Sequence, residues 1–196
     1  MKIPLTFITL LLISLQFSQA QSPTEFYSKE FKWKMPLPAG FVQQTLAQYT
    51  DNANKGAELV GKGLNVTIDD RAHQVCSFKY GTTDYFEANE HPFSKELYGD
   101  FVASCYNIEN EFYTSIKNQT AGRFKIDTLH STEVIDGLVF QYFKMQCSAG
   151  NTIVANYLVY TRLFDNNEFS ILIVFGAKQS GDKMIAAWKD SKFGKD

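Results

Sequence analysis

The stretch that decides the fold runs from Arg123 to Gly176, RFKIDTLHSTEVIDGLVFQYFKMQCSAGNTIVANYLVYTRLFDNNEFSILIVFG. It contains four runs rich in β-branched and aromatic residues, a composition typical of strands. Short polar segments separate the runs, and short connections require antiparallel neighbours because parallel strands need a long crossover. We therefore expect four consecutive antiparallel strands, at Arg123–Val134, Leu138–Cys147, Thr152–Phe164 and Phe169–Phe175.

The composition of the connections supports this meander. Asp136-Gly137 is the strongest hairpin signal, since a two-residue type I′ turn needs positive φ at both central positions. Ser148–Asn151 and Asp165–Asn167 are further turn compositions. The run Phe169–Phe175 is apolar on both faces, and neither face of Thr152–Phe164 is plainly polar. We therefore expect helices over at least part of both faces of the sheet.

Two helices flank the meander in the sequence. The first is expected at Phe93–Ile116 with Ser94 as its N-cap, and the second at Gly181–Phe193 with Ser180 as its cap. Apolar residues recur at helical spacing in both and predict the packed faces. These residues are Leu97, Phe101, Cys105, Ile108, Phe112 and Ile116 in the first helix, and Met184, Ile185, Trp188 and Phe193 in the second.

The N-terminal half predicts shorter elements. Alternation predicts a strand at Phe26–Met35, which Pro36 and Pro38 end because proline cannot donate to a central ladder. The segment Gly81–Pro92 is polar and rich in turn residues, so we expect an irregular loop there. The remaining expectations are a strand or short helix beginning in Gly40–Tyr49, a weak helix or loop at Asn52–Gly63, and strands at Leu64–Ile68 and His73–Tyr80.

Residues 1–20 have the pattern of a signal peptide. Lys2 supplies the positive start, Leu5–Leu15 is the apolar core, and Ser18-Gln19-Ala20 fits the small-x-small cleavage pattern. The apolar run is too short for a membrane span, and no cysteine near the cleavage site could carry a lipid. We expect a secreted or periplasmic protein without a transmembrane anchor, whose mature part, residues 21–196, forms one domain.

Composition limits the classes of partner. The 196-residue chain has a formal net charge of -2, so it lacks the basic balance that nucleic-acid binding requires. Aromatic residues make up 15% of the chain and supply a substantial core. In an oxidising compartment Cys76, Cys105 and Cys147 predict one disulfide and one free thiol, with the pairing open.

The candidate binding residues lie in the expected loop. Asp84, Glu87, Glu90 and His91 combine carboxylates with an imidazole, which could bind a divalent cation. A solvated acidic loop is the alternative, because the ligand spacing of an EF-hand is absent. The sequence predicts no catalytic residue.

The other histidines do not belong to a catalytic motif. His73 and His130 are isolated in the sequence, and no Gly-x-Ser-x-Gly or His-Glu-x-x-His pattern is present. A Ser- or Cys-His-Asp arrangement stays open, because triads assemble from distant positions.

The order of the elements resembles a known fold. A Pro-x-Gly-aromatic turn (Pro38-Ala39-Gly40-Phe41) follows the first strand, a long helix precedes the meander, and the chain closes with Phe169–Phe175 and a helix containing Ala187-Trp188. This order is similar to that of the PsbP-like fold, named after the extrinsic subunit of photosystem II and also seen in small secreted bacterial proteins. We expect an α+β fold: an α/β/α sandwich around a mainly antiparallel sheet, with a long central helix and a C-terminal helix.

The resemblance implies a non-enzymatic binding or adaptor role, with a protein or a small molecule as partner. No functional residue of the family matches a position of this sequence. Two alternatives remain: an exported inhibitor or immunity protein, and a metal-dependent hydrolase that uses the 84–91 segment.

Overall fold

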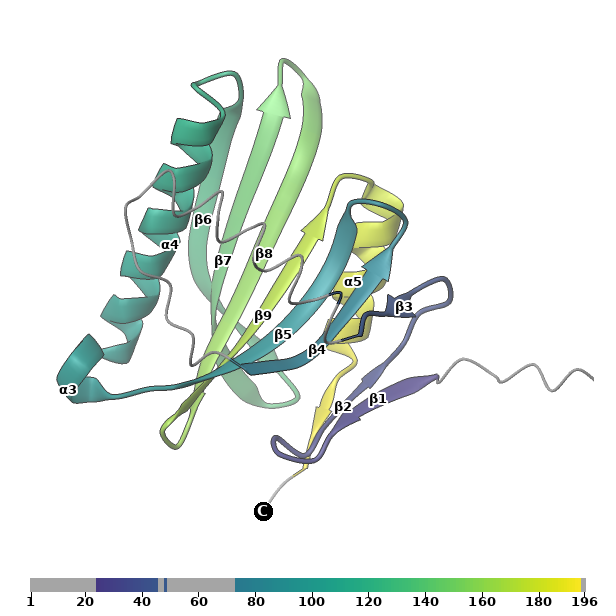
Figure 1. Ribbon diagram of the computed structural model, residues 1–196, viewed down its shortest axis with the longest axis vertical. Helices are drawn as coiled ribbons and strands as arrows, with labels where there is room; N and C mark the ends of the chain where they lie inside the picture. Colours follow the sequence, from purple (N-terminus) through teal and green to yellow (C-terminus); the bar gives the residue numbers. More distant parts are fainter. Residues whose placement is uncertain (1–23, 46–47, 49–72, 195–196) are drawn as a thin grey trace, which may run out of the picture.

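The computed structural model describes residues 24–45, 48 and 73–194. In these residues a seven-stranded sheet has the order β3-β4-β5-β9-β8-β7-β6, and every neighbouring pair is antiparallel (Figure 1). Its strands are β3 (Val42–Gln43), β4 (His73–Tyr80), β5 (Asp84–Pro92), β6 (Lys125–Ile135), β7 (Leu138–Ala149), β8 (Thr152–Phe164) and β9 (Asn167–Phe175).

The four-stranded meander is confirmed as β6 to β9. Ile135 pairs with Leu138 across a two-residue turn. Within that turn Asp136 has φ 49° and Gly137 has φ 81°, as a type I′ hairpin requires. The turn between β8 and β9 likewise places Asp165 at φ 50°. Turn chemistry therefore sets the register of the strands that carry most of the core.

The expected strand Phe26–Met35 is wrong, because this segment is a hairpin. β1 (Glu25–Ser28) and β2 (Trp33–Pro36) pair antiparallel, with Ser28 opposite Trp33. The turn between them contains neither Gly nor Pro, so the apolar alternation in the sequence runs through it without a break. Lys32 supplies the left-handed conformation of the turn, at φ 46°. β10 (Lys192–Phe193) pairs with β2 and completes a second, three-stranded sheet.

The expected loop Gly81–Pro92 is also wrong. Only its first residues turn, and β5 then pairs with β4 on one side and with β9 on the other. Asp, Glu and Asn have low strand propensity, which hides the alternation of buried Phe86 and Ala88 with the partly exposed residues between them. Pairing with the apolar strand β9 overrides that propensity.

The long central helix is interrupted. α3 (Lys95–Tyr98) ends at Gly99, which has φ 74°, and α4 (Phe101–Gln119) begins after its N-cap Asp100. The Asp100 carboxylate accepts a hydrogen bond from the Ala103 amide, whereas Ser94 makes no side-chain cap to the backbone of α3. The predicted packed face is partly wrong, because Leu97 and Ile108 are exposed; Ser104, Cys105, Glu109 and Ser115 are the buried residues of α4.

The closing helix begins and ends earlier than expected. α5 (Lys178–Lys189) has Ala177 as its N-cap, so Ser180 lies inside the helix. Phe193 belongs to β10, where its amide donates to the Asp136 carboxylate at 2.9 Å. α5 packs against β9 and β5 of the large sheet and against β2 of the small one. The long helix α4 packs on β7 from the other face, which gives helices on both faces (Figure 1).

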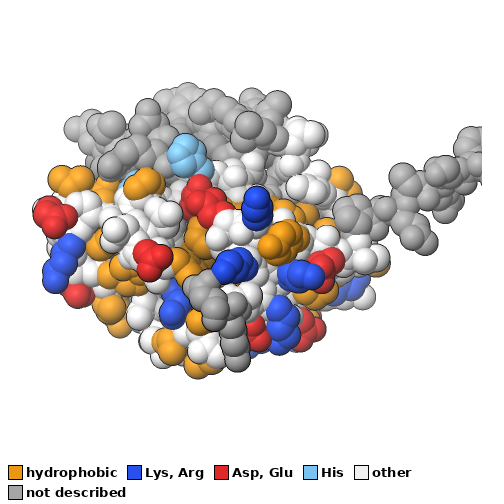
Figure 2. Space-filling view, turned by 90° about the horizontal axis from the view of Figure 1, so that it is seen from below, with side chains coloured by type: hydrophobic (Ala, Val, Ile, Leu, Met, Phe, Trp, Pro, Cys, Tyr) orange, Lys and Arg blue, Asp and Glu red, His pale blue; other side chains and the backbone are white. Residues whose placement is uncertain are grey.

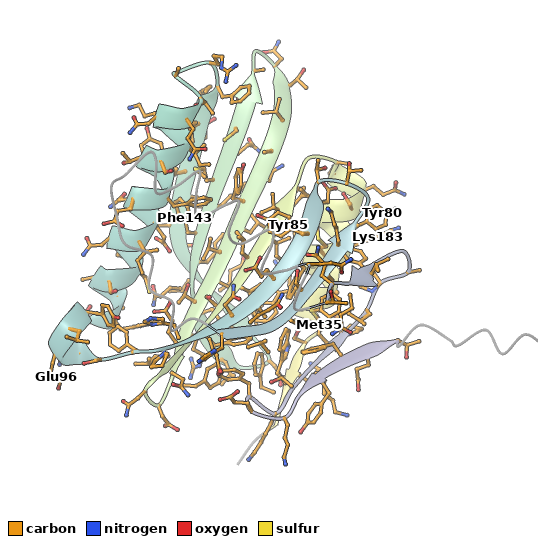
Figure 3. The ribbon with its side chains drawn as sticks, viewed as in Figure 1. Met35, Tyr80, Tyr85, Glu96, Phe143 and Lys183 are labelled. Atoms are coloured by element: carbon orange, nitrogen blue, oxygen red, sulfur yellow. The ribbon has the colours of Figure 1, made fainter. Side chains whose placement is uncertain are left out.

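Large aromatic side chains form the core between the two sheets and α5. Trp33, Phe86, Phe140, Phe169 and Trp188 are all fully buried. Figure 3 shows two further core residues, Met35 on the small sheet and Phe143 between β7 and α4. The expected signal peptide (residues 1–20), the segment Asn52–Gly63 and the strand Leu64–Ile68 lie outside the described residues.

Trp188 is predicted to be a major contributor to stability. Its side chain has no exposed surface and touches Trp33 from β2 and Phe140 from β7. Trp188→Ala should lower the free energy of unfolding by roughly 3–5 kcal/mol, because it leaves a large cavity. Urea denaturation measures this loss. In the control variant Leu97→Ala, which changes an exposed side chain, the loss should stay within about 0.5 kcal/mol. Equal losses in the two variants would contradict the packing role.

Candidate functional site

The four predicted binding residues lie on β5, where they do not share a face. Side chains alternate along a strand, so Asp84 and Glu90 point to the face covered by α5, and Glu87 and His91 point to the other. Within the described part of the chain, no three His, Cys, Asp or Glu side chains gather closely enough to hold a metal ion. The structure therefore separates these residues instead of bringing them together.

Asp84 joins β5 to the start of α5. Its carboxylate accepts hydrogen bonds from the Gly176 amide at 3.0 Å, from the Thr83 hydroxyl at 3.0 Å and from the Ser180 hydroxyl. Burial alone would raise the pKa of the Asp84 carboxyl, but these hydrogen bonds outweigh burial and lower it. A buried carboxylate with this many donors has a structural role.

The other three β5 residues have partners nearby. The Glu87 carboxylate accepts from the Asn89 amide at 2.7 Å, and the His91 ring packs against Tyr98 at 5.7 Å between centroids. Burial raises the pKa of Glu90, and a hydrogen bond and negative charge from Glu30 in the β1–β2 turn raise it further. Each side chain thus belongs to a different local contact.

A partly buried acid–histidine pair links α4 to β6, and the sequence analysis missed its acidic member. His130 Nδ1 lies 2.7 Å from Glu109 Oε2. Burial raises the pKa of Glu109, while the contact with His130 lowers it, and the net direction is upward. Cys105 lies one helical turn before Glu109 and, like Ser131, lines the same small cavity. The i, i+4 spacing of Cys105 and Glu109 places both on one face of a helix, and this was the signal available in the sequence. It does not show that His130 of β6 lies opposite Glu109.

This pair does not form a working nucleophilic site. The cavity beside it measures about 10 Å³, enough for about one water molecule and no substrate. Burial, together with nearby carboxylates, raises the pKa of the Cys105 thiol to about 12, whereas a nucleophilic cysteine needs a lowered pKa. The arrangement supports a structural link between α4 and the sheet.

All three cysteines are buried and unpaired, so the expected disulfide is wrong for this structure. Cys76 lies on β4, Cys105 on α4 and Cys147 on β7, three separate elements. Burial raises the pKa of all three thiols.

The main candidate site is a cavity at one end of the molecule, which we call the end cavity. It has a volume of about 600 Å³ and is open to solvent on one side. Four segments far apart in the sequence line it, and all four lie at the lower end of the molecule in Figure 1. They are the β1–β2 turn, the β6–β7 turn, the β8–β9 turn and the C-terminal strand β10.

Aromatic rings form the apolar wall of the end cavity. Phe31 and Phe193 are mostly buried and Phe164 is partly exposed. The Phe164 ring lies 5.5 Å from Phe31 and 5.8 Å from Phe193 between centroids, so the three rings form a continuous surface. They extend the aromatic core out to solvent.

Arg162 is the cation within this wall. On β8 it lies two residues before Phe164, so both side chains share a face, and its guanidinium centre is 5.3 Å from the Phe164 ring centroid. The ladder between β7 and β8 ends at Gln141 and Thr161, and beyond it the guanidinium donates to the Val139 carbonyl at 2.7 Å. The Arg162 Nε–H is buried and has no hydrogen-bond partner in the described part of the chain.

Charges of both signs surround the end cavity. The described residues of its lining include two cations, Lys32 and Arg162, and three anions, Glu30, Asp136 and Asp165. Figure 2 looks onto this end, where Lys and Arg side chains lie beside Asp and Glu side chains around hydrophobic ones. Asp136 is engaged by Lys192 at 3.1 Å and by the Phe193 amide.

The backbone at the rim is strained. Lys32, Asp136 and Asp165 are non-glycine residues with positive φ, and each lines the end cavity. Such conformations cost free energy and gather at functional sites. The sequence indicated the turns at Asp136 and Asp165, but it predicted a continuous strand through Lys32, and nothing in it indicated that the three turns meet.

Comparisons with known proteins identify the fold. Neither models of protein families nor curated protein sequences gave a match. The solution structure of cyanobacterial PsbP (CyanoP) from Synechocystis sp. PCC 6803 matches with a TM-score of 0.53 and 8% identity, over 92% of this chain and 99% of that one. The chain therefore has the PsbP-like fold.

A crystal structure from Bacteroides thetaiotaomicron VPI-5482 is also similar, with 12% identity over 88% of this chain and 49% of that chain. Its TM-score is 0.41. Among the helices that the structure describes, none is long and apolar enough to cross a bilayer.

Asp84 is predicted to stabilise the fold in a pH-dependent way. Asp84→Asn should cost about 1–3 kcal/mol at pH 7, because an amide cannot replace a carboxylate that only accepts hydrogen bonds. The folded pKa lies below the unfolded value of about 3.9, so this contribution is complete above that value and is lost as the pH falls through the folded pKa. Urea denaturation at pH 7 and at low pH should show the difference between wild type and variant shrinking in acid.

The matched control is Asp182→Asn, which changes an exposed carboxylate on α5 paired only with Lys178. Its effect should stay within about 0.5 kcal/mol. If Asp84→Asn behaves like this control, Asp84 is not a structural carboxylate.

The cysteines are predicted to be free in the native protein. Purified without reductant, the protein should release three reactive thiols after unfolding in urea, measured with a thiol-specific chromogenic reagent. The folded protein should react slowly, because burial both shields the thiols and raises their pKa. A reduced sample gives the reference count. A single thiol in the unreduced sample would reveal a disulfide.

Proposed function

We propose that this protein is an exported, non-enzymatic binding module that acts in the periplasm or outside the cell, and that the end cavity is its binding site. Export rests on Lys2, the apolar run Leu5–Leu15 and the cleavage pattern Ser18-Gln19-Ala20. The PsbP-like fold is compatible with such a role, although a fold by itself does not define a function.

The observation that supports a binding site is the make-up of the end cavity. Ligand sites are typically about 300–1,000 Å³, mainly apolar, with a few placed polar groups. The end cavity, at about 600 Å³, combines three aromatic rings with one under-bonded guanidinium. Its strained rim is held by hydrogen bonds such as that from the Gly194 amide to the Lys32 carbonyl at 2.8 Å.

A non-enzymatic role is favoured by the chemistry of the alternatives. The Glu109–His130 pair has room for no substrate, and the adjacent thiol has a raised pKa. Among the described residues that line it, the end cavity has carboxylates and cations but no histidine, cysteine or serine. Binding is the function that this set of groups serves best.

Fragment binding measured by NMR tests the proposal. With residues 21–196 labelled with ¹⁵N, a library of small aromatic fragments should shift amide signals of the residues that line the end cavity. Phe164→Ala removes the partly exposed ring and should weaken the best fragment about tenfold, which corresponds to about 1.4 kcal/mol.

The matched control is Phe112→Ala, which removes a partly buried ring that packs on Tyr157 at the other face of the sheet. It should reduce stability without changing fragment affinity. The proposal is wrong if fragments shift signals elsewhere or nowhere, or if both variants bind fragments equally well.

A further inference from the structure

Arg162 gives the end cavity a preference for one kind of chemical group. Arginine presents five N–H donors, and with the residues that the structure describes the Arg162 guanidinium forms one hydrogen bond, to the Val139 carbonyl. Its Nε–H is buried without a partner, and no carboxylate of the described residues forms an ion pair with it. An under-bonded guanidinium is matched in shape by a carboxylate, which accepts two parallel N–H bonds.

The aromatic wall indicates the chemistry of the part of the ligand that lies away from Arg162. Phe31, Phe164 and Phe193 line the end cavity beside the guanidinium, so a ligand held at Arg162 extends over ring surface. Burying an apolar group there contributes about 25 cal/mol per Å². Flat rings gain further from stacked or edge-to-face contacts.

The remaining charges limit the ligand to a single negative charge. Asp136 already pairs with Lys192, but Glu30 and Asp165 also line the end cavity and repel anions. The described lining carries two cations, Lys32 and Arg162, against these two carboxylates and Asp136, so a dianion such as a phosphate monoester meets a lining with no excess positive charge. A neutral ligand leaves the Arg162 guanidinium unpaired.

We propose that the end cavity binds a singly charged organic carboxylate with a flat apolar body, its carboxylate on Arg162 and its body on the phenylalanine wall. This inference rests on the proposed function, since it names the ligand class of the same site. Four probes with one phenyl ring distinguish it from other classes: 3-phenylpropionate, its amide, 3-phenylpropylamine and phenyl phosphate.

Isothermal titration calorimetry at low salt should rank the probes. The carboxylate should bind at least about tenfold more tightly than the amide, as expected for loss of a charged hydrogen bond worth about 1.5–3 kcal/mol. Phenyl phosphate should bind more weakly than the carboxylate, and the amine should not bind. Trp33 stacks on Phe193 at 6.3 Å, so its fluorescence gives a second readout at the site.

Arg162→Gln is the decisive variant, because glutamine keeps an amide donor for the Val139 carbonyl but removes the charge. It should bind the carboxylate and the amide equally. Arg123→Gln is the matched control, since Arg123 is exposed and also donates to a carbonyl, that of Thr120 at 3.1 Å. It should bind the carboxylate as the wild type does, and thermal unfolding of both variants checks that they fold.

The outcomes separate the two proposals. If the amide or the phosphate binds as well as the carboxylate, or if Arg162→Gln keeps full affinity for it, the carboxylate inference is overturned while the end cavity remains a binding site. If neither these four probes nor any library fragment binds in the end cavity, both the carboxylate inference and the proposed function are wrong.

Discussion

The packing of Trp33 against Trp188 connects parts of the chain that are far apart in sequence. Their rings lie 5.9 Å apart, edge to face, and Trp33 Nε1 donates to the buried Ser191 hydroxyl at 2.9 Å. Trp33 comes from the N-terminal hairpin and Trp188 from α5, and Phe193 in β10 contacts both. Because each buried aromatic ring removes about 150–250 Å² from water, this cluster attaches the small sheet and α5 to the large sheet.

The end cavity depends on that same cluster. Phe31 and Phe193 are core residues that also line the cavity, so the cavity is the place where the aromatic core opens to solvent. Close packing behind these rings fixes their positions before any ligand arrives. A ligand on such a surface loses little free energy to ordering of the protein, which makes a modest area of contact effective. The stability of the core and the shape of the site are therefore coupled through these rings.

The sequence predicted the elements whose signals are local. Asp136-Gly137 identified the hairpin because its turn type depends on two adjacent residues, and the apolar run Phe169–Phe175 identified the strand β9. β5 was missed because its polar residues have low strand propensity and its pairing with β9 is not local. The end cavity was missed for the same reason: four short segments form it, and only the tertiary structure brings them together.

Hydrogen bonding separates the structural polar groups from the candidate ligand-binding group. Asp84 is buried with three donors, and Glu109 is buried against His130, so both are satisfied within the fold. Four buried side-chain atoms of the described residues have no partner, on Gln74, Glu90, Arg162 and Trp188. Of these residues only Arg162 lines the end cavity. An unpaired buried donor is a cost to folding, and Arg162 alone among these four residues combines such a donor with a place in the lining of the end cavity. This combination, rather than charge or burial alone, singles out Arg162.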